Sequence, residues 1–328
     1  MTAVTVVVPA RNEERSIAAC LDSILSQDER DLQVLVVDGA STDRTAGVVR
    51  DYIERDPRVE LLHNPQRIIP VALNIALAAA RGTYLVRVDA HARIPPNYVS
   101  RALTHLRAIK WGGVGGRKDG MGGGPAGRAV AAAMASRFGV GNSTYHYGRR
   151  AQPVEHVPFG AYPVVLVREL GGWDESLRVN QDFEFDYRVR RAGHELLFDP
   201  DLVIHWENRQ SVGDLFRQYR RYGRGKLKVV LKHPKSLRPR HLAAPALVAT
   251  LGAAAALAPR RPGAAAALVL PYAVGLGVAS SRTVGSVDPP ARPYVAPAFL
   301  AMHVGWGLGF LEAAAAAVLP RRRARGGR

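Results

Sequence analysis

The sequence predicts a Rossmann-like α/β fold, with a mostly parallel sheet flanked by helices, followed by transmembrane helices in its C-terminal part. Three observations predict this architecture. Short runs of β-branched residues alternate with segments of helical periodicity through roughly the first hundred residues. Polar side chains come directly after several of these runs. From about residue 242 onward the composition changes to Ala, Leu, Val and Gly.

The alternation defines the elements one by one. Four short apolar runs predict strands: residues 4–8, 32–37, 59–62 and 83–88. Three segments with apolar residues at helical spacing predict helices: residues 16–26, 42–54 and 71–80. Because a helix separates successive strands, we expect these strands to pair in parallel.

Glycine is concentrated in residues 112–127, a stretch that we expect to form a mobile loop. It lacks the Gly-Lys-Ser/Thr pattern of a phosphate-binding loop. A single cysteine, Cys20, excludes an intrachain disulfide framework and fits a reducing compartment.

The net charge of +17 is distributed unevenly along the chain. Residues 210–328 hold 19 Lys and Arg but only 3 Asp and Glu, and the basic residues bracket long apolar runs. A nucleic-acid binder usually spreads its charge over a polar folded face, so we expect no nucleic-acid partner. Bracketed apolar runs are typical of the cytoplasmic edges of membrane proteins. We therefore expect the chain to contact membrane lipids in the inner (cytoplasmic) membrane, with its α/β domain in the cytoplasm.

Three apolar segments follow, at residues 242–258, 263–281 and 294–319. The second and third are long enough to span a bilayer, whereas the first is Ala-rich and contains Pro245. If all three crossed, Arg260, Arg261 and the basic tail 321–328 would lie outside, against the positive-inside bias. We therefore favour two full spans, the second and the third, with an interfacial or re-entrant first segment.

Residues 212–241 combine aromatic and cationic side chains, a pattern that predicts an amphipathic helix on an anionic membrane surface. The alternative is a charged connecting helix with no contact to lipid. The expected organisation is an α/β domain at 1–210, a basic interface segment at 211–241 and a transmembrane region with a basic tail at 242–328.

Five polar motifs stand in the chain at or after these elements. Two follow the first two strands, Pro9-Ala10-Arg11-Asn12-Glu13 and Asp38-Gly39-Ala40-Ser41-Thr42-Asp43. Asp89-Ala90-His91 follows the fourth strand, and Gln181-Asp182 and Gln218-x-x-Arg221-Tyr222 come later. The carboxyl edge of an open α/β sheet is where such folds bind nucleotides.

Taken in this order over residues 4–235, the motifs resemble those of the family 2 glycosyltransferases, which have the GT-A fold. The chain looks most similar to the membrane-anchored glucosyltransferases of succinoglycan-type exopolysaccharide assembly. The resemblance implies that Asp38 contacts the donor's base, with Pro9, Ala10, Asn12 and Glu13 lining the same nucleotide-sugar pocket. The alternative for Asp38 is a cap of the next helix, a role for which Asp43 competes.

Asp89 and His91 match the metal-and-diphosphate motif of that family, with His91 in place of the usual second acid. A carboxylate with a neighbouring ligand can hold a divalent metal against a diphosphate. Imidazole suits Mn²⁺ better than Mg²⁺, and His91 has the alternative of contacting ribose or phosphate directly. We therefore expect Mn²⁺ or Mg²⁺ as cofactor, with Asp89 also contacting the donor.

Asp182 is the expected general base, which removes the proton of the incoming hydroxyl group. The family usually has Glu-Asp here, where this chain has Gln181-Asp182, and Glu184 and Asp186 are alternative bases. Gln218, Arg221 and Tyr222 resemble the family's Gln-x-x-Arg-Trp motif, which holds the acceptor glycan and the diphosphate. A guanidinium suits phosphate oxygens, although Arg221 could also be an ordinary surface cation.

The resemblance implies an inverting hexosyltransferase, with glucose from UDP-glucose as the expected donor and a polyprenyl-diphosphate-linked or other membrane-associated acceptor. Cell-surface polysaccharide synthesis is the expected process, and other polysaccharide-assembly proteins are candidate partners. Two alternatives stay open: a polyprenyl-phosphate sugar synthase and a non-catalytic nucleotide-binding membrane scaffold. Too few spans disfavour a processive synthase, and the absence of a Gly-rich triphosphate loop disfavours a sugar nucleotidyltransferase.

Overall fold

The computed structural model describes residues 3–108 and 110–318, which form two compact units. The first unit runs to Met121 and resumes over Met134–Asn208. The second joins Gly122–Ala133 to the residues from Arg209 onward. The basic tail 321–328, which the sequence analysis assigned to the cytoplasm, lies outside the described residues.

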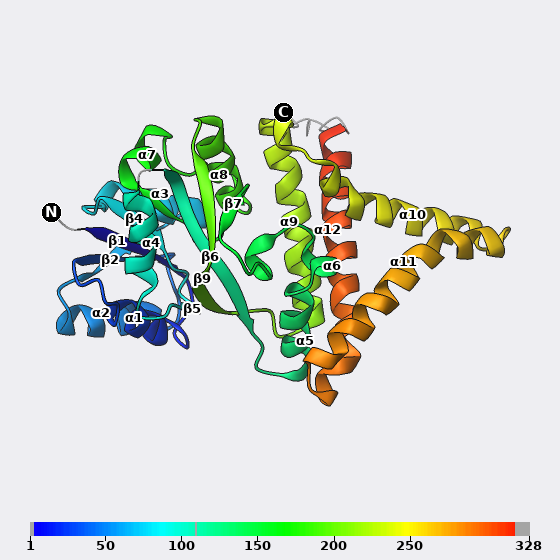
Figure 1. Ribbon diagram of the computed structural model, residues 1–328, viewed down its shortest axis with the longest axis horizontal. Coiled ribbons are helices and arrows are strands. Elements are labelled where there is room, and N and C mark those ends of the chain that lie inside the picture. The colour runs from blue at the N-terminus through cyan, green and yellow to red at the C-terminus, as the bar shows by residue number, and fades with distance from the viewer. Residues whose placement is uncertain (1–2, 109, 319–328) are drawn as a thin grey trace, which may run out of the picture. The chain divides into compact units, whose positions relative to one another are not determined.

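The first unit contains one mixed sheet (Figure 1). Its strands are β1 (Val4–Ala10), β2 (Leu32–Asp38), β3 (Val59–His63), β4 (Tyr84–Arg87), β5 (Ala92–Arg93), β6 (Trp111–Met121), β7 (Gln152–Val154), β8 (Ala161–Pro163) and β9 (Glu195–Glu207). Their order is β3-β2-β1-β4-β8-β6-β9-β5, with β7 also paired to β9. The first four strands of this order pair in parallel, as predicted, and so do β6 and β9. Strand β8 is antiparallel to both β4 and β6.

Helices cover both faces of this sheet. They are α1 (Ile17–Leu25), α2 (Thr45–Arg55), α3 (Ile69–Ala79), α4 (Tyr98–Arg107), α7 (Val164–Glu169) and α8 (Gln181–Arg191), and the first unit also contains the short helix α6 (Arg137–Val140) and a 3₁₀ turn η1 (Thr144–His146). Figure 1 shows α1 and α2 on one side of the first strands and α3 and α7 on the other. The predicted α/β fold is confirmed, and each of the seven predicted elements is present within three residues of its expected ends.

The glycine-dense stretch 112–127 is not a loop, so that prediction is wrong. Residues Trp111–Met121 form β6, and Pro125 begins α5 (Pro125–Met134). The glycines are required because neighbouring atoms occupy the space of a side chain. A Cβ on Gly113 would meet the ring of Tyr162, and one on Gly116 would overlap the backbone of Leu202. Glycine here marks close approach of strands rather than mobility.

We expect Gly116→Ala to destabilise the first unit by about 1–3 kcal/mol or more, because its Cβ would force β6 and β9 apart. Gly124→Ala is the matched control, since a Cβ on Gly124 would meet nothing within 4 Å. Thermal unfolding of the detergent-solubilised protein measures both. Equal melting temperatures for the two variants would show that β6 and β9 are not packed as described.

The second unit is almost entirely helical. It contains α5, α9 (Val212–Lys232), the 3₁₀ turns η2 (Pro234–Ser236), η3 (Pro239–Leu242), η4 (Val284–Ser286) and η5 (Pro289–Tyr294), and the helices α10 (Ala243–Leu257), α11 (Pro262–Thr283) and α12 (Val295–Val318). The predicted helix 212–241 ends earlier than expected, at Lys232, since Pro234 disfavours helical backbone at the residue before it. Among residues 3–108 and 110–318, three stretches of helix are long and apolar enough to cross a membrane: residues 239–257, 262–286 and 289–318.

Candidate functional site

The carboxyl ends of β1, β2 and β4 bring several of the predicted site residues to one edge of the sheet. Ala10 lies opposite Asp38 in the β1–β2 register, and Pro9 lies opposite Val37. The backbone N–H of Val88 donates to Val7 at 3.0 Å, so that Asp89 emerges beside the end of β1. Neighbouring strands are about 4.8 Å apart, which places Asp38 and Asp89 roughly 10 Å from each other along this edge.

Asp38 is buried, and its carboxylate accepts the N–H of Ser41 at 3.2–3.3 Å. Hydrogen bonds join the loop after β1 to the turn that follows Asp38. Asn12 donates its N–H to Ser41 Oγ at 2.9 Å, and its side-chain oxygen accepts the N–H of Thr42 at 2.9 Å. The alternative role of Asp38, a cap of the next helix, is not observed, because α2 begins at Thr45 and Asp38 bonds to Ser41 in the turn before it, whereas Asp43 accepts the N–H of Thr45. The same bonds hold Asn12 and Asp38 in fixed positions, as the wall of a preformed pocket requires.

Asp89 is paired with Arg87, the last residue of β4. The guanidinium binds both carboxylate oxygens, with Nε–Oδ1 at 2.7 Å and Nη2–Oδ2 at 3.1 Å. Burial alone would lower the pKa of Arg87, but the paired Asp89 and the nearby charge of Asp182 raise it. Arg87 is thus a permanent positive charge that acts on both predicted acids.

Glu13 and His91 come together although they are distant in sequence. Nδ1 of His91 lies 3.0 Å from Oε1 of Glu13. Burial would lower the pKa of His91, but the bond to Glu13 and the charge of Asp89 raise it. The imidazole therefore tends toward its charged form, which favours contact with phosphate over binding to a metal.

Oxygen ligands for a divalent metal are few at this edge. Within residues 3–108 and 110–318, no three His, Cys, Asp or Glu side chains are grouped so that they could hold a metal ion by themselves. Mn²⁺ and Mg²⁺ are also held by one or two carboxylates, with the phosphates of a substrate completing the coordination. The residues fit a metal in that shared arrangement, for which Asp89 would supply the carboxylate.

Three acids on α8 were candidates for the general base, and the structure distinguishes them by exposure. The Asp182 side chain is 31% exposed, in the first turn of the helix. Glu184 is buried and pairs with Arg188 through both oxygens, at 2.8 and 3.0 Å. Asp186 is completely buried. Of the three, only Asp182 is open to an incoming hydroxyl group.

The buried Asp186 has three hydrogen-bond donors. They are Nδ1 of His156 at 2.7 Å, the N–H of Val157 at 2.9 Å and the hydroxyl of Tyr162 at 2.7 Å. The other ring nitrogen of His156, Nε2, lies 4.0 Å from Asp182. Asp186 therefore orients the imidazole, which in turn faces the partly exposed Asp182.

The charges around Asp182 oppose the effect of its burial. Burial would raise the pKa of Asp182, but the charges of His156, Arg87 and Lys118 and the N–H of Phe183 lower it overall. His146, also nearby, stays neutral because burial and the charges of Lys118 and His156 lower its pKa to about 3. The result is a carboxylate that stays ionised at neutral pH.

Lys118 projects from β6 between two aromatic rings. Its Nζ lies 3.6 Å from the centroid of Trp206 and 4.8 Å from that of Phe159. The guanidinium of Arg87 lies 5.4 Å from the same Phe159 ring. Phe159 has a φ of 50°, a left-handed conformation that is rare for a bulky residue and often occurs at functional sites. Phe159 thus orients two cations near Asp182.

Gln218, Arg221 and Tyr222 lie on α9, in the second unit. The amide of Gln218 donates to the hydroxyl of Tyr222 at 2.8 Å, one helical turn on. Gln218 is buried, Tyr222 is half-buried and Arg221 is exposed. The structure therefore joins two members of the motif directly and leaves the guanidinium accessible.

Sequence reasoning missed Arg87, Lys118, His156 and Phe159. One signal was available for Arg87, a charged residue inside an otherwise apolar buried strand. Lys118 was hidden in the glycine-dense stretch. His156 has no local pattern, because its partners Asp182 and Asp186 lie about thirty residues away.

Comparison with known proteins assigns this chain to a family. A model described as glycosyl transferase family 2 matches residues 5–164. The chain is 31% identical over 317 residues to the succinoglycan biosynthesis protein ExoA of Rhizobium meliloti (strain 1021), covering 94% of each protein. The chain belongs to glycosyltransferase family 2.

This family 2 glycosyltransferase resembles further proteins. One relative is the dolichyl N-acetyl-alpha-D-glucosaminyl phosphate 3-beta-D-2,3-diacetamido-2,3-dideoxy-beta-D-glucuronosyltransferase of Methanococcus voltae. The two chains are 25% identical over a region that covers 69% of this chain and 73% of the relative. The mannosyltransferase PcManGT of Pyrobaculum calidifontis, solved with GDP-Man and Mn²⁺, aligns with a TM-score of 0.63 and 25% identity over 93% of this chain and 86% of that one. The predicted family, GT-A fold and enzyme class are confirmed.

Proposed function

We propose that this glycosyltransferase is inverting and metal-dependent, and that it transfers a hexose from a nucleoside diphosphate to a lipid-linked acceptor. UDP-glucose is the first donor to test, and a polyprenyl-diphosphate-linked glycan in cell-surface polysaccharide synthesis is the first acceptor. Supporting this, one relative is named for succinoglycan biosynthesis and another for transfer to a dolichyl-phosphate-linked sugar. In this proposal residues 1–210 are catalytic, 211–241 lie at the interface of the cytoplasmic membrane, and 242–328 anchor the enzyme.

The observation that carries the proposal is the environment of Asp182. It is the accessible acid on α8, it is kept ionised by neighbouring cations, and Arg87 connects it electrostatically with Asp89. A general base and a binding site for the leaving diphosphate are the two requirements of inverting transfer.

In the proposed step, the acceptor hydroxyl attacks the anomeric carbon from the face opposite the diphosphate. Asp182 takes the hydroxyl proton while the new C–O bond forms. The bond to the diphosphate breaks, and its electron pair leaves with the nucleoside diphosphate. Lys118 and Arg87 supply positive charge near the developing negative charge. A divalent metal held by Asp89 would add Lewis-acid stabilisation of the diphosphate when bound.

The remaining residues bind the two substrates in this proposal. Pro9, Ala10, Asn12, Glu13 and Asp38 surround the nucleotide at the ends of β1 and β2. His91, whose pKa is raised, contacts the phosphates rather than the metal. The motif of α9 holds the acceptor, with the exposed Arg221 available for a phosphate of the lipid carrier.

The direct test incubates membranes containing the enzyme with Mn²⁺, lipid-extracted acceptors and a panel of radiolabelled sugar nucleotides, including UDP-glucose and GDP-mannose. We expect label to move into the organic phase with release of nucleoside diphosphate. A product with the sugar joined directly to a lipid phosphate would favour the polyprenyl-phosphate sugar synthase. Absence of transfer with every donor would favour the nucleotide-binding scaffold.

We expect His156→Gln to move the acid limb of the pH–activity profile to higher pH. Glutamine can still bond to Asp186 but carries no charge, so the pKa of Asp182 should rise and its ionised fraction should fall at low pH. The ratio of variant to natural kcat/KM should therefore decline as the pH is lowered. His63→Gln, at an exposed position, is the control. A uniform loss at every pH would indicate that His156 is only structural.

A further inference from the structure

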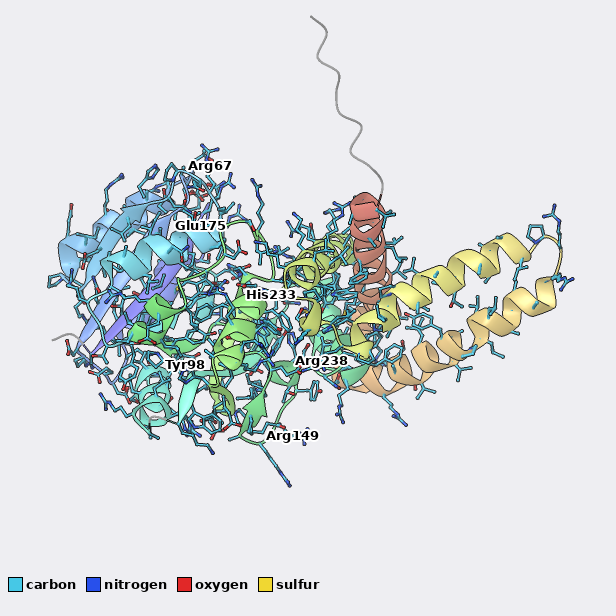
Figure 2. The ribbon with its side chains drawn as sticks, turned by 90° about the horizontal axis from the view of Figure 1, so that it is seen from above. Arg67, Tyr98, Arg149, Glu175, His233 and Arg238 are labelled. Carbon is cyan, nitrogen blue, oxygen red and sulfur yellow. The ribbon has the colours of Figure 1, made fainter. Side chains whose placement is uncertain are left out.

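The apolar helices of the second unit differ in what surrounds them. Half of the most apolar 18 residues in the stretch 289–318, which includes α12, are buried inside the protein, against 11% for the corresponding residues of the stretches 239–257 and 262–286. On α11, Leu270 and Val274 are 60% and 55% exposed. Figure 1 shows α10 and α11 leaving α12 and meeting at their far ends, and Figure 2 shows the same projecting pair in a perpendicular view. Large apolar faces are therefore uncovered on α10 and α11.

Helix α12 packs closely along α9. A Cβ on Gly223 of α9 would overlap the backbone of Trp306, and one on Gly309 of α12 would overlap the backbone of Arg220. Gly305 likewise faces the backbone of Phe216. Later residues of one helix meet later residues of the other, so the two helices run parallel over residues 216–224 and 305–312.

This shared stretch is strongly charged. Glu312 of α12 pairs with Arg220 and Arg224 of α9, with Nε–O distances of 2.9 and 2.7 Å. Arg217 and Arg221 lie on the same segment of α9 and are exposed. A layer of acyl chains that enclosed α12 here would also enclose this segment of α9. Arginine among acyl chains is costly, so this part of α12 does not suit the interior of a bilayer.

A second ion pair fixes the connection between α11 and α12. Arg128 of α5 binds both carboxylate oxygens of Asp288, at 2.7 and 2.8 Å. Helix α5 follows β6 after three residues. The start of α10 is held on α12 too, since Gly307 faces the backbone of Ala244. The start of α10 is thus fixed on α12 and the chain after α11 is fixed on α5, while midway along α11 the hydroxyl oxygen of Tyr272 lies 2.9 Å from Nδ1 of His303 on α12.

We propose that α10 and α11 insert as a hairpin into the acyl-chain region of a lipid bilayer, while the part of α12 that packs on α9, residues 305–312, remains outside it. Residues 243–258 and 262–281 contain no charged side chain. The 22 residues of α11 extend about 33 Å, enough for a hydrocarbon layer of about 30 Å. Arg260 and Arg261 lie at the turn, on the far side of the layer and against the positive-inside bias, where their long side chains can reach headgroups. This assignment replaces the sequence-based expectation that segments 263–281 and 294–319 are the two spans.

Matched cysteine variants test the assignment in lipid vesicles. Ala273→Cys on α11 and Ala315→Cys on α12 change the same residue type at exposed positions. The natural Cys20 is fully buried and should give little background. Each protein is reconstituted into vesicles of phosphatidylethanolamine and phosphatidylglycerol, opened by freeze–thaw so that both faces meet a membrane-impermeant maleimide. We expect Ala315→Cys to react at least tenfold faster than Ala273→Cys, and the two to react alike in unfolding detergent.

Every other pattern overturns the proposal. Protection of both thiols would place α12 in the bilayer, and rapid labelling of both would show that the hairpin is not inserted. Leu270→Cys and Val318→Cys, at more exposed positions of the same helices, form a second pair if a variant of the first fails to fold. The labelling rates require no enzymatic activity, so this test is independent of the proposed reaction.

Discussion

Asp182→Asn should lower kcat by about 10²–10⁴-fold, the usual contribution of a general base, with little change in the affinity for the sugar nucleotide. Asparagine keeps the size of the side chain and its place in the first turn of α8, but it cannot accept the proton of the acceptor hydroxyl. The measurement is transfer of radiolabelled sugar under saturating donor, together with donor binding by calorimetry.

Two variants control this experiment. Asp51→Asn, an exposed position on α2, makes the same chemical change away from the site and should transfer at the natural rate. Asp186→Asn removes a fully buried carboxylate with three donors, and should lower the melting temperature as well as the rate. Transfer by Asp182→Asn at a rate close to the natural one would exclude Asp182 as the base.

Asp89→Asn should weaken Mn²⁺-dependent binding of the sugar nucleotide by about a hundredfold or more, the upper range for altered metal sites. It should also destabilise the protein by about 3 kcal/mol, because the buried charge of Arg87 loses its ionic partner. Calorimetric titration of the nucleotide with Mn²⁺ and with EDTA measures the first effect, and thermal unfolding measures the second. EDTA should abolish tight donor binding by the natural enzyme and change little in the variant.

The chain offers a close control for Asp89. Arg117 and Asp119 form the same Arg-x-Asp pair on β6, with Nε–Oδ1 at 2.9 Å, but both side chains are more than a third exposed. Asp119→Asn should therefore change stability little, because exposed ion pairs contribute little. If Asp89→Asn lowers stability but keeps full Mn²⁺-dependent binding, Asp89 only neutralises Arg87.

The first four strands were predictable because each is a short, mainly apolar run, with at most one charged residue, that is followed by polar residues. Burial on both faces removes the need for alternation, and that signal is local. The glycine-dense strand β6 could not be recognised this way. Its glycines are required by Tyr162, Val157 and Leu202, which come from segments forty or more residues later. No pattern within the strand itself indicates those neighbours.

The residues of the candidate site were likewise predictable from the sequence only in part. Asp38, Asp89 and Asp182 stand at element ends, where sequence order alone indicates chemistry. Choosing Asp182 over Glu184 and Asp186 required knowledge of burial, since helical periodicity places Asp182 and Asp186 on similar faces. The roles proposed for Lys118 and His156 depend on side chains from β6, β8 and α8 meeting in space, which residue spacing does not encode.

The chain passes between its two compact units three times, after Met121, after Ala133 and after Asn208. Between the first and second of these passages lies α5, which clusters with the residues from Arg209 onward. Its residues Ala129, Val130 and Ala133 are completely buried. A fragment ended at residue 210 would keep α5 but lose the helices that cover it. Attempts to obtain a soluble catalytic fragment, or to exchange anchors among relatives, must therefore treat residues 122–133 as belonging with the anchor.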